Sequence, residues 1–225
     1  MLNFTRHFKD GRTDQVSMTP EALIVAGWTG RDEAALNHHI EELAAIGVPR
    51  PSSVPVFYRN AVTNIVQTGR LEVLGPDTSG EVEPVIVALN DGLWIGLGSD
   101  HTDRKAETMG IALSKQLCGK VIGAALWKFE DIAPHWDSIV IRSYATIDGA
   151  RILYQEGLLS LMRDPVDLMT RYGRPFVANT VIMCGTIGAK GGIRPAARFD
   201  MELEDPVLKR RMAHGYDVVT LPVVS

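Results

Sequence analysis

Two acidic residues, Glu81 and Glu83, stand one residue apart at the start of an apolar run, Pro84 to Leu89. On an extended strand such residues project from the same side, so the two carboxylates are expected side by side. They repel each other unless a proton or a hard cation lies between them. Asp100 follows the next apolar run and can supply a third oxygen. The three carboxylates predict a site for Mg²⁺, Mn²⁺ or Ca²⁺.

Each acidic residue also has a plainer interpretation. Glu81 and Glu83 could be outward-facing residues of an edge strand. Asp100 and Asp103 could cap a helix that begins near Lys105, a common structural use of aspartate. Capping and metal binding are compatible, because a capping loop is also where ligands project. We therefore favour the metal site.

Length, charge and cysteine content restrict the class of protein. A chain of 225 residues can bury a sizeable core and still form one domain. Its net charge of −4 and its lack of a basic run argue against a nucleic-acid partner. Neither a membrane-spanning segment nor a signal peptide is visible. Cys118 and Cys184 lack metal-ligand spacing, so free thiols and a cytoplasmic location are expected.

The apolar pattern predicts many short strands and few helices. One helix is expected between Thr29 and Gly47, with a capping box at Thr29–Asp32. A second is expected over 105–118, and a third over either 155–162 or 165–172. Strands are expected at 71–74, 85–89, 93–97, 139–141, 181–183, 199–203 and 218–222. This pattern favours an α+β fold with a rolled or barrel-like mixed sheet.

Five motifs, in order, resemble the fumarylacetoacetate hydrolase superfamily, and in particular a compact bacterial branch of it. The resemblance covers roughly residues 35–205. In the family a Glu-x-Glu strand and an Asn-Asp-x-Ser-x-Arg segment supply the metal ligands. Glu81-Val-Glu83 resembles the first, and Ser99-Asp100-His-Thr102-Asp-Arg104 resembles the second. The resemblance implies a mixed β-roll in which Glu81, Glu83 and Asp100 hold a divalent cation, Mg²⁺ or Mn²⁺ before Ca²⁺.

Three further motifs resemble the substrate side of the family site. Gly119-Lys120 stands where the family has a Gly-Lys-Ser turn, Gly185-Thr186-Ile187-Gly188 where it has Gly-Thr-Pro-x-Gly, and His39-Ile-Glu-Glu42 where it has a His-x-x-Glu lid helix. The implied substrate-binding residues are Arg104, Glu107, Lys120, Gly185 and Thr186. The implied catalytic residues are His39, Glu42 and Lys120. The implied organisation is an N-terminal strand and lid region over 1–60 and a metal-binding β-roll over 61–225, within one continuous domain.

Two of these assignments have alternatives. Glu42 lies three residues after His39 on a helix, so its carboxylate can orient the imidazole as a general base. The same pair could be a half-buried histidine with an incidental ion pair. Lys120 is flanked by apolar residues, so it is either an anion-holding group or a lysine whose stem crosses apolar surface.

The departures from the family pattern concern the substrate more than the metal. The segment between Glu83 and Asp100 is short, so a connecting helix is expected to be absent. Ile187 replaces the family proline, and Val121 replaces the serine after the lysine.

The resemblance implies a homodimer acting on a small 2-oxo or 1,3-diketo acid through a metal-bound enolate. Hydrolysis of a C–C bond, as in acylpyruvate or fumarylacetoacetate cleavage, is the favoured reaction. Decarboxylation, hydration or dehydration could use the same site. A non-catalytic metal-containing protein that binds small molecules is the alternative from another class.

Overall fold

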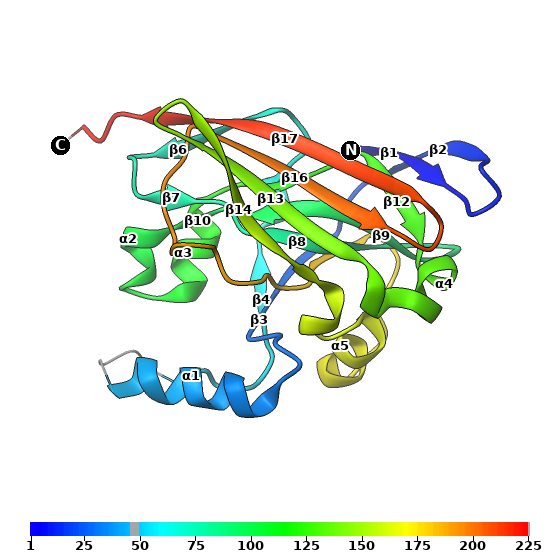
Figure 1. Ribbon diagram of the computed structural model, residues 1–225, viewed down its shortest axis with the longest axis horizontal. Coiled ribbons are helices and arrows are strands. Elements are labelled where there is room, and N and C mark those ends of the chain that lie inside the picture. Colours follow the sequence, from blue (N-terminus) through cyan, green and yellow to red (C-terminus); the bar gives the residue numbers. More distant parts are fainter. Residues whose placement is uncertain (46–49, 225) are drawn as a thin grey trace.

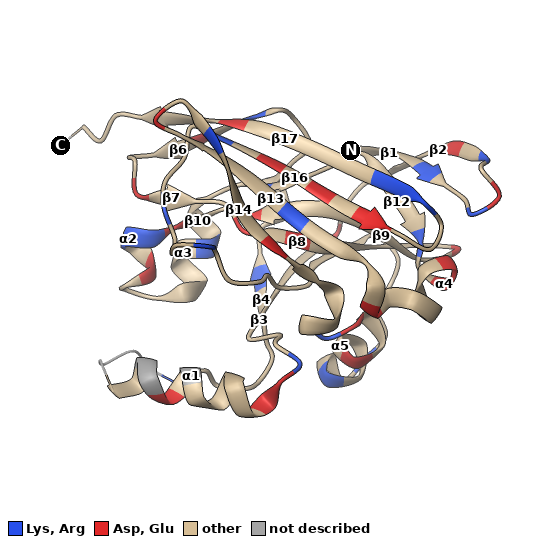
Figure 2. Cartoon of the chain, viewed as in Figure 1, with Lys and Arg blue, Asp and Glu red and all other residues tan. Residues whose placement is uncertain are grey.

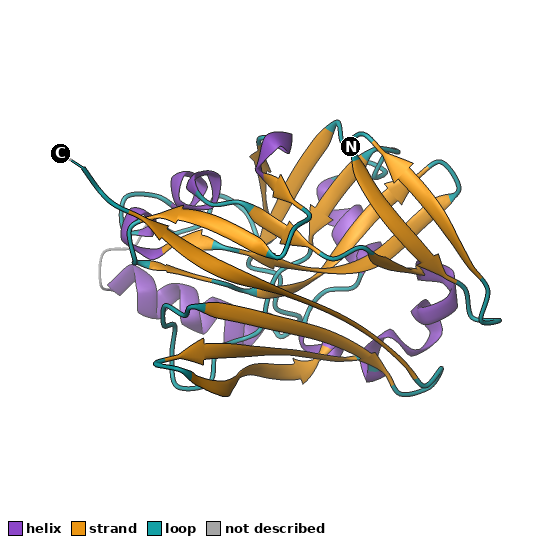
Figure 3. Cartoon of the chain, turned by 90° about the horizontal axis from the view of Figure 1, so that it is seen from above, coloured by secondary structure: helices purple, strands orange, loops and turns teal. Residues whose placement is uncertain are grey.

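Two packed β-sheets form the body of the protein, as the computed structural model shows (Figures 1 and 3). The structure describes residues 1–45 and 50–224, without the side chains of His39, Glu42 and Leu43. The strands of the larger sheet are β1 (Leu2–His7), β2 (Thr13–Met18), β3 (Ala22–Gly27), β4 (Val56–Asn60), β5 (Ile65–Val66), β8 (Val82–Leu89), β9 (Gly92–Asp100), β11 (Lys120–Ile122), β12 (Ala125–Lys128) and β15 (Thr180–Met183). Their order is β2-β1-β12-β9-β8-β15-β3-β4, with β11 beside β9 and β5 beside β11.

The smaller sheet covers one face of the larger one. Its strands are β6 (Arg70–Leu74), β13 (Val140–Ile147), β14 (Ala150–Leu158), β16 (Arg198–Asp205) and β17 (Arg210–Leu221), in the order β14-β13-β16-β17-β6. A two-stranded ribbon pairs β7 (Thr78–Ser79) with β10 (Thr102–Asp103). The ribbon pairs the residues just before Glu81 with the residues just after Asp100. It therefore holds the two segments of the predicted metal site together.

The helices lie outside the sheets. They are α1 (Glu33–Ala45), α2 (Arg104–Glu107), α3 (Ile111–Leu117), α4 (Phe129–Ile132) and α5 (Pro165–Tyr172), with 3₁₀ turns at Val62–Asn64, Ala133–Ser138 and Leu159–Leu161. In Figure 1, α1 lies below the ends of β3 and β4, and α2 and α3 lie beside the β7–β10 ribbon. No helix in the described part of the chain is long and apolar enough to cross a membrane.

The sequence pattern of each sheet follows from how many of its faces are covered. In β8 the alternating residues Val85 and Ile86 enter two separate apolar clusters, because both faces of this sheet are buried. In β16 only one face is covered, so Phe199 and Leu203 point inward while polar residues alternate with them. The outward face of the smaller sheet is charged (Figure 2), and there Arg142 forms ion pairs with Glu156, Glu202 and Glu204.

The predicted mixed α+β fold is confirmed, and each predicted strand overlaps an observed one. Three local predictions need correction. The helix over 105–118 is two helices, because residues 108–110 separate α2 from α3. Of the two alternatives for the next helix, 165–172 is right and 155–162 is wrong, because β14 extends to Leu158. The first helix is capped by Asp32, whose carboxylate accepts the backbone N–H groups of Ala34 and Ala35, and not by Thr29.

Candidate metal centre

The three predicted carboxylates meet at one point of the larger sheet. Glu81, Glu83 and Asp100 each present a ligand oxygen, and these atoms lie within 4.8 Å of one another. Glu83 is the second residue of β8 and Asp100 is the last of β9. Because the two strands pair antiparallel, the ends that carry these carboxylates lie side by side. The backbone N–H of Asp100 donates to Glu81 O at 3.0 Å, which fixes the third carboxylate against the first.

The short segment between Glu83 and Asp100 has a simple structural cause. Leu89 pairs with Gly92, so Asn90 and Asp91 alone turn the chain from β8 into β9. The hairpin takes the place of the connecting helix that the family pattern contains. Because it brings the carboxylates of Glu83 and Asp100 together directly, the predicted absence of a connecting helix does not separate them.

Burial gives the carboxylates unequal proton affinities. Glu83 is 1% exposed, and its pKa is well above the ordinary value because burial and the nearby charge of Asp100 both oppose ionisation. Burial would also raise the pKa of Asp100, but Lys115 and Lys120 outweigh it and lower that pKa to about 2. Nearby lysines stabilise the negative charge of Asp100 more than they stabilise that of Glu83.

Lys115 is the residue that the sequence interpretation missed. Its Nζ contacts Asp100 Oδ2 and lies 3.7 Å from Glu81 Oε2. Burial alone would lower the pKa of Lys115, but Asp100, Glu81 and Glu83 raise it above the ordinary value, so this ammonium stays charged. A signal existed in the sequence, because Ile111 and Lys115 are four residues apart and share a face of the predicted helix after Asp100.

Lys120 lies behind the carboxylates. Its side chain is fully buried, its Nζ is 2.7 Å from Asp100 Oδ1, and it donates to His101 O at 2.6 Å. Lys120 is not among the residues that line the adjacent cavity, whereas Lys115 is. Of the two lysines, the geometry favours Lys115 as the ammonium that faces a bound molecule.

Arg104 and Glu107 form the next layer. Arg104 donates to Glu81 Oε1 at 2.8 Å, to Glu107 Oε2 at 3.0 Å and to Ser79 Oγ at 2.7 Å. Burial opposes its charge, but Glu81 and Glu107 raise the pKa of Arg104 above its ordinary value. Asp103 caps α2 by accepting the N–H of Ala106, as one of the plainer interpretations predicted.

The Gly185-Thr186 segment is held against the same carboxylates. The backbone N–H of Gly185 donates to Glu83 Oε2 at 2.8 Å. The hydroxyl of Thr186 donates to Val82 O at 2.8 Å and accepts from Gln155 Nε2 at 2.8 Å. Its hydrogen is thus committed to β8, and Thr186 can offer a bound molecule only its remaining lone pair.

A buried polar network supports Asp100 from the smaller sheet. The Tyr216 hydroxyl lies 2.8 Å from Ser99 Oγ and 2.9 Å from His101 Nδ1. His101 Nε2 contacts Thr78 Oγ1 at 2.9 Å, and burial together with Lys120 and Arg104 lowers the pKa of His101 to about 3. His101 is therefore a neutral structural residue that faces away from the carboxylates.

The carboxylates open into a cavity of about 440 Å³. Its lining comes from β3 and the segment after it, α1, β4, the segment between β7 and β8, the start of β8, α2, α3, β14 and the segment after β15. The lining residues are Ala26, Gly27, Trp28, Thr29, Gly30, Leu36, Tyr58, Gly80, Glu81, Glu83, Arg104, Glu107, Ile111, Lys115, Tyr154, Gln155, Gly185, Thr186, Ile187, Gly188, Ala189 and Ile193. Four of the five predicted substrate-binding residues are among them, and Lys120 is not.

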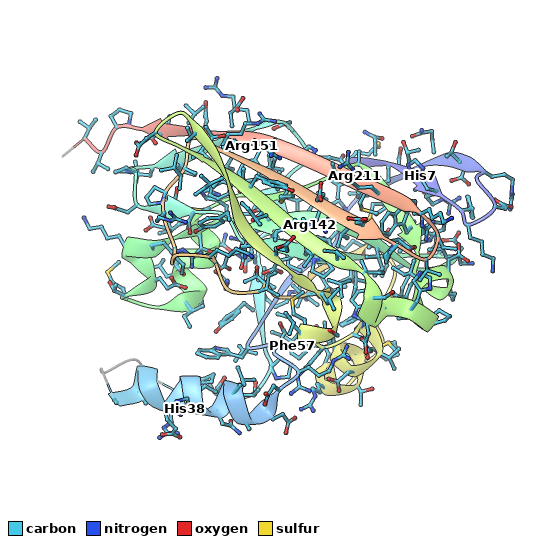
Figure 4. All side chains as sticks on the ribbon, viewed as in Figure 1. His7, His38, Phe57, Arg142, Arg151 and Arg211 are labelled. Atoms are coloured by element: carbon cyan, nitrogen blue, oxygen red, sulfur yellow. The ribbon has the colours of Figure 1, made fainter. Side chains whose placement is uncertain are left out.

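The predicted dyad of His39 and Glu42 lies on α1, but both side chains are outside the described residues. Leu36, one turn earlier on α1, lines the cavity. His38 is exposed and projects away from the sheets (Figure 4). The role of the dyad stays a prediction.

The donor set fits a divalent cation. Carboxylate oxygens are the ligands that Mg²⁺ and Mn²⁺ prefer, and two of the three carboxylates are buried. When ionised, Glu81, Glu83, Asp100 and Glu107 exceed the cations Arg104, Lys115 and Lys120 by one negative charge. A hard cation would relieve this excess where it is greatest, at Glu83.

Comparison with solved structures identifies the fold as that of fumarylacetoacetate hydrolase family proteins. One such protein from yeast matches with a TM-score of 0.63 and 16% identity over 91% of this chain and 95% of its own. A 2-keto-3-deoxy-D-arabinonate dehydratase, solved with magnesium and 2,5-dioxopentanoate, matches with 0.64 and 15% over 95% and 85%. A maleylpyruvate hydrolase from Sphingobium sp. SYK-6, solved with manganese and pyruvate, matches with 0.59 and 14% over 89% and 71%.

The chain itself belongs to the family described as "Protein of unknown function (DUF2848)", whose sequence model matches residues 26–216. A search of curated proteins gave no match. The resemblance inferred from the motifs is thus confirmed at the level of fold.

Proposed function

We propose that this protein is a divalent-metal-dependent enzyme that acts on 2-oxo or 1,3-diketo acids, with hydrolysis of a C–C bond as its reaction. The observation that carries the proposal is the meeting of Glu81, Glu83 and Asp100 beside a cavity that Lys115 also lines. A metal bound there would supply a Lewis acid that polarises a carbonyl group. An adjacent carboxylate and carbonyl, as in an oxo acid, form a pair of oxygens suited to such a site.

The chain's own cations have distinct tasks in this proposal. Lys115 faces the cavity and holds a substrate oxygen by a charge-assisted hydrogen bond. Lys120 stays in contact with Asp100 and fixes the orientation of that carboxylate. Arg104, anchored by Glu81 and Glu107, contributes positive potential at the cavity wall.

Water activation is assigned to α1. Leu36 lines the cavity, and His39 lies three residues later, on the same face of the helix. Glu42 is three residues further and would hold the imidazole in the orientation of a general base.

The structural neighbours support the substrate class. The two solved with ligands hold a divalent metal together with an oxo compound, pyruvate in one and 2,5-dioxopentanoate in the other. One is a hydrolase and the other a dehydratase, so the shared fold supports the site more closely than the reaction.

Turnover of 2,4-dioxopentanoate tests the proposal. Metal-stripped protein is supplied with Mg²⁺ or Mn²⁺, and formation of pyruvate and acetate is followed by chromatography. We expect cleavage that stops on addition of a chelator and that Glu83→Gln abolishes. Metal-dependent binding of oxalate without turnover of any oxo acid would favour the alternative, a non-catalytic metal-containing protein that binds small molecules. Absence of both metal and oxalate binding would overturn the site.

A further inference from the structure

The cavity beside the metal centre is charged at one end only. Among the described residues that line it, the acidic and basic side chains are Glu81, Glu83, Arg104, Glu107 and Lys115. All of them belong to the carboxylate cluster or contact it. The rest of the wall is uncharged. It includes the polar side chains of Thr29, Gln155 and Thr186, and a larger apolar and aromatic part formed by Trp28, Leu36, Tyr58, Ile111, Tyr154, Ile187 and Ile193.

The aromatic part of this wall has a constrained local structure. Trp28 has φ of 59°, in the left-handed region that a bulky residue rarely adopts. Gly27 precedes it, and a Cβ at Gly27 would lie 3.0 Å from Tyr58 Cε2, so the Tyr58 ring rests directly on the backbone of β3. Backbone strain of this kind persists where the surrounding structure imposes it, commonly at binding sites.

Tyr58 lines the same cavity as Lys115 and Trp28. Burial raises the pKa of its hydroxyl, and Lys115 and a side-chain hydrogen bond with Trp28 lower it in part. The ring, packed on Gly27, continues the apolar wall. A ligand held at the carboxylates would place its remaining atoms against this ring.

The charge balance limits what the ligand can carry. Four carboxylates and three cations leave the cluster with one negative charge, which a divalent cation would turn into one positive charge. A single substrate carboxylate neutralises that charge. A second carboxylate would lie in the part of the cavity that no described cation lines, and it would lose hydration against the apolar wall without gaining an ion pair.

The cavity is also larger than the smallest oxo acids need. Its volume of about 440 Å³ falls within the range of roughly 300–1,000 Å³ that is typical of small-molecule pockets. Pyruvate or oxalate would fill the charged end and leave the wall of Trp28, Tyr58 and Ile193 in contact with water.

We propose that the substrate is a monocarboxylic oxo acid whose tail is uncharged and apolar or aromatic, and that Trp28 and Tyr58 select this tail. The inference rests on the proposed function, since the metal centre anchors the carboxylate end. It goes beyond that function by excluding dicarboxylic oxo acids as preferred substrates.

Binding of three oxo acids to the Mn²⁺-loaded protein, measured by calorimetry, tests the inference. Pyruvate has no tail, 2-oxo-4-phenylbutanoate has an aromatic tail, and 2-oxoglutarate has a charged one. We expect the phenyl compound to bind about tenfold or more tightly than pyruvate, because its tail buries apolar surface. We expect 2-oxoglutarate to bind more weakly than the phenyl compound by a similar factor.

Variants at the wall locate the effect. Tyr58→Leu should reduce the advantage of the phenyl compound over pyruvate, and Tyr58→Phe should keep it. Phe57→Leu is the matched control. Phe57, labelled in Figure 4, neighbours Tyr58 on β4. Its ring contacts that of Tyr172 on α5, with ring centroids 5.0 Å apart. Ile193 is exposed at the cavity wall, so Ile193→Lys should fold normally and tighten 2-oxoglutarate binding about two- to fivefold.

The results separate the two proposals. Metal-dependent oxalate binding with equal affinities for pyruvate and the phenyl compound would overturn the tail assignment and leave the metal site intact. Tighter binding of 2-oxoglutarate than of the phenyl compound would do the same. If neither oxalate nor any oxo acid binds the Mn²⁺-loaded protein, both proposals fail.

Discussion

The backbone N–H of Gly185 donates a hydrogen bond to the carboxylate of Glu83 across 2.8 Å. The contact requires glycine on two grounds. Gly185 has φ of 93°, and a Cβ there would lie 1.8 Å from Thr29 Oγ1. One buried carboxylate is thereby tied to the end of β15 and to the cavity wall beyond β3.

Substitution of Gly185 should damage both stability and the site. We expect Gly185→Ala to destabilise the protein by about 2–4 kcal/mol, because it combines a forced contact with an unfavourable φ. Gly188→Ala is the control, since nothing lies within 4 Å of its Cβ position. Urea unfolding of both variants measures the difference. Equal stabilities would show that the loop relaxes freely around residue 185.

Glu83→Gln should abolish metal binding without unfolding the protein. Glu83 is buried beside Asp100 and Glu81, and its raised pKa shows that its charge is opposed in the metal-free state. Glutamine keeps an oxygen for the Gly185 N–H and removes that charge. We expect the metal-free variant to melt at the same temperature as the wild type or higher. Elemental analysis and thermal melts test this, and full metal occupancy in the variant would contradict the site.

The two lysines should respond differently to replacement by methionine. Lys115→Met removes a cation that would repel the metal, so divalent-metal affinity should stay equal or increase. Oxalate binding should weaken by about 1.5–3 kcal/mol, the range for a charge-assisted hydrogen bond. Lys120→Met breaks a fully buried ion pair and should cost about 3–5 kcal/mol of folding stability. Calorimetry and urea unfolding on both variants would decide, and the reverse pattern would make Lys120 the substrate-facing lysine.

His39→Ala and Glu42→Ala should impair the same catalytic step. A positioned acid–base group contributes about 10²- to 10⁴-fold, and two residues that act as a unit are strongly non-additive. Oxalate binding should survive both substitutions, because it does not require an activated water. Rates for the two single variants and the double variant complete the test. Two small effects that multiply would describe an ordinary surface pair.

Asp205 should control stability in acid, away from the metal centre. It accepts hydrogen bonds from the backbone of Val207 and Leu208, at 3.1 and 3.0 Å, and lies 3.0 Å from His135 Nε2. Burial would raise the pKa of Asp205, but these contacts lower it below the ordinary value of 3.8. A lowered folded-state pKa means that the contribution to stability is present above pH 3.8 and is lost as the pH falls through the folded-state value.

Asp205→Asn should therefore flatten the acid side of the stability curve. At neutral pH the loss should be about 1–3 kcal/mol, because charge-assisted contacts are replaced by neutral ones. Urea unfolding between about pH 3 and 7 measures it, with Asp200→Asn, on the same strand β16, as the control. Parallel curves for Asp205→Asn and the wild type would mean that Asp205 does not titrate as described.

The parts of the site that were predictable from the sequence are those set by local spacing. Glu83 lies on β8 and Glu81 lies just before that strand, so the two carboxylates are close in the chain, and Asp100 joins them because β8 and β9 form a hairpin. The apolar runs predicted the positions of β8, β9 and β15, because strands of this sheet are buried on both faces. The fold class followed from the number of short strands and the scarcity of helices.

The rest depended on contacts between distant segments. Helical spacing puts Lys115 on the same face as Ile111, but it does not show that the ammonium meets Asp100. The pattern around Lys120 is equally compatible with either side of the sheet. Trp28 and Tyr58 reach one cavity because β3 pairs with β4. Thr186 matched the family motif, but its hydroxyl forms hydrogen bonds with Val82 O and Gln155 Nε2. These bonds join distant segments, so the sequence did not predict them.

The pairing of Glu83 with Gly185 also has a consequence for folding kinetics. The two residues are 102 positions apart, and β15 must insert between β8 and β3 before they can meet. Closing so long a loop carries an entropic cost, and chains rich in such contacts fold slowly. The β8–β9 hairpin can form early, but the complete metal cradle cannot. Acquisition of metal affinity during refolding should therefore mark the moment at which the larger sheet closes.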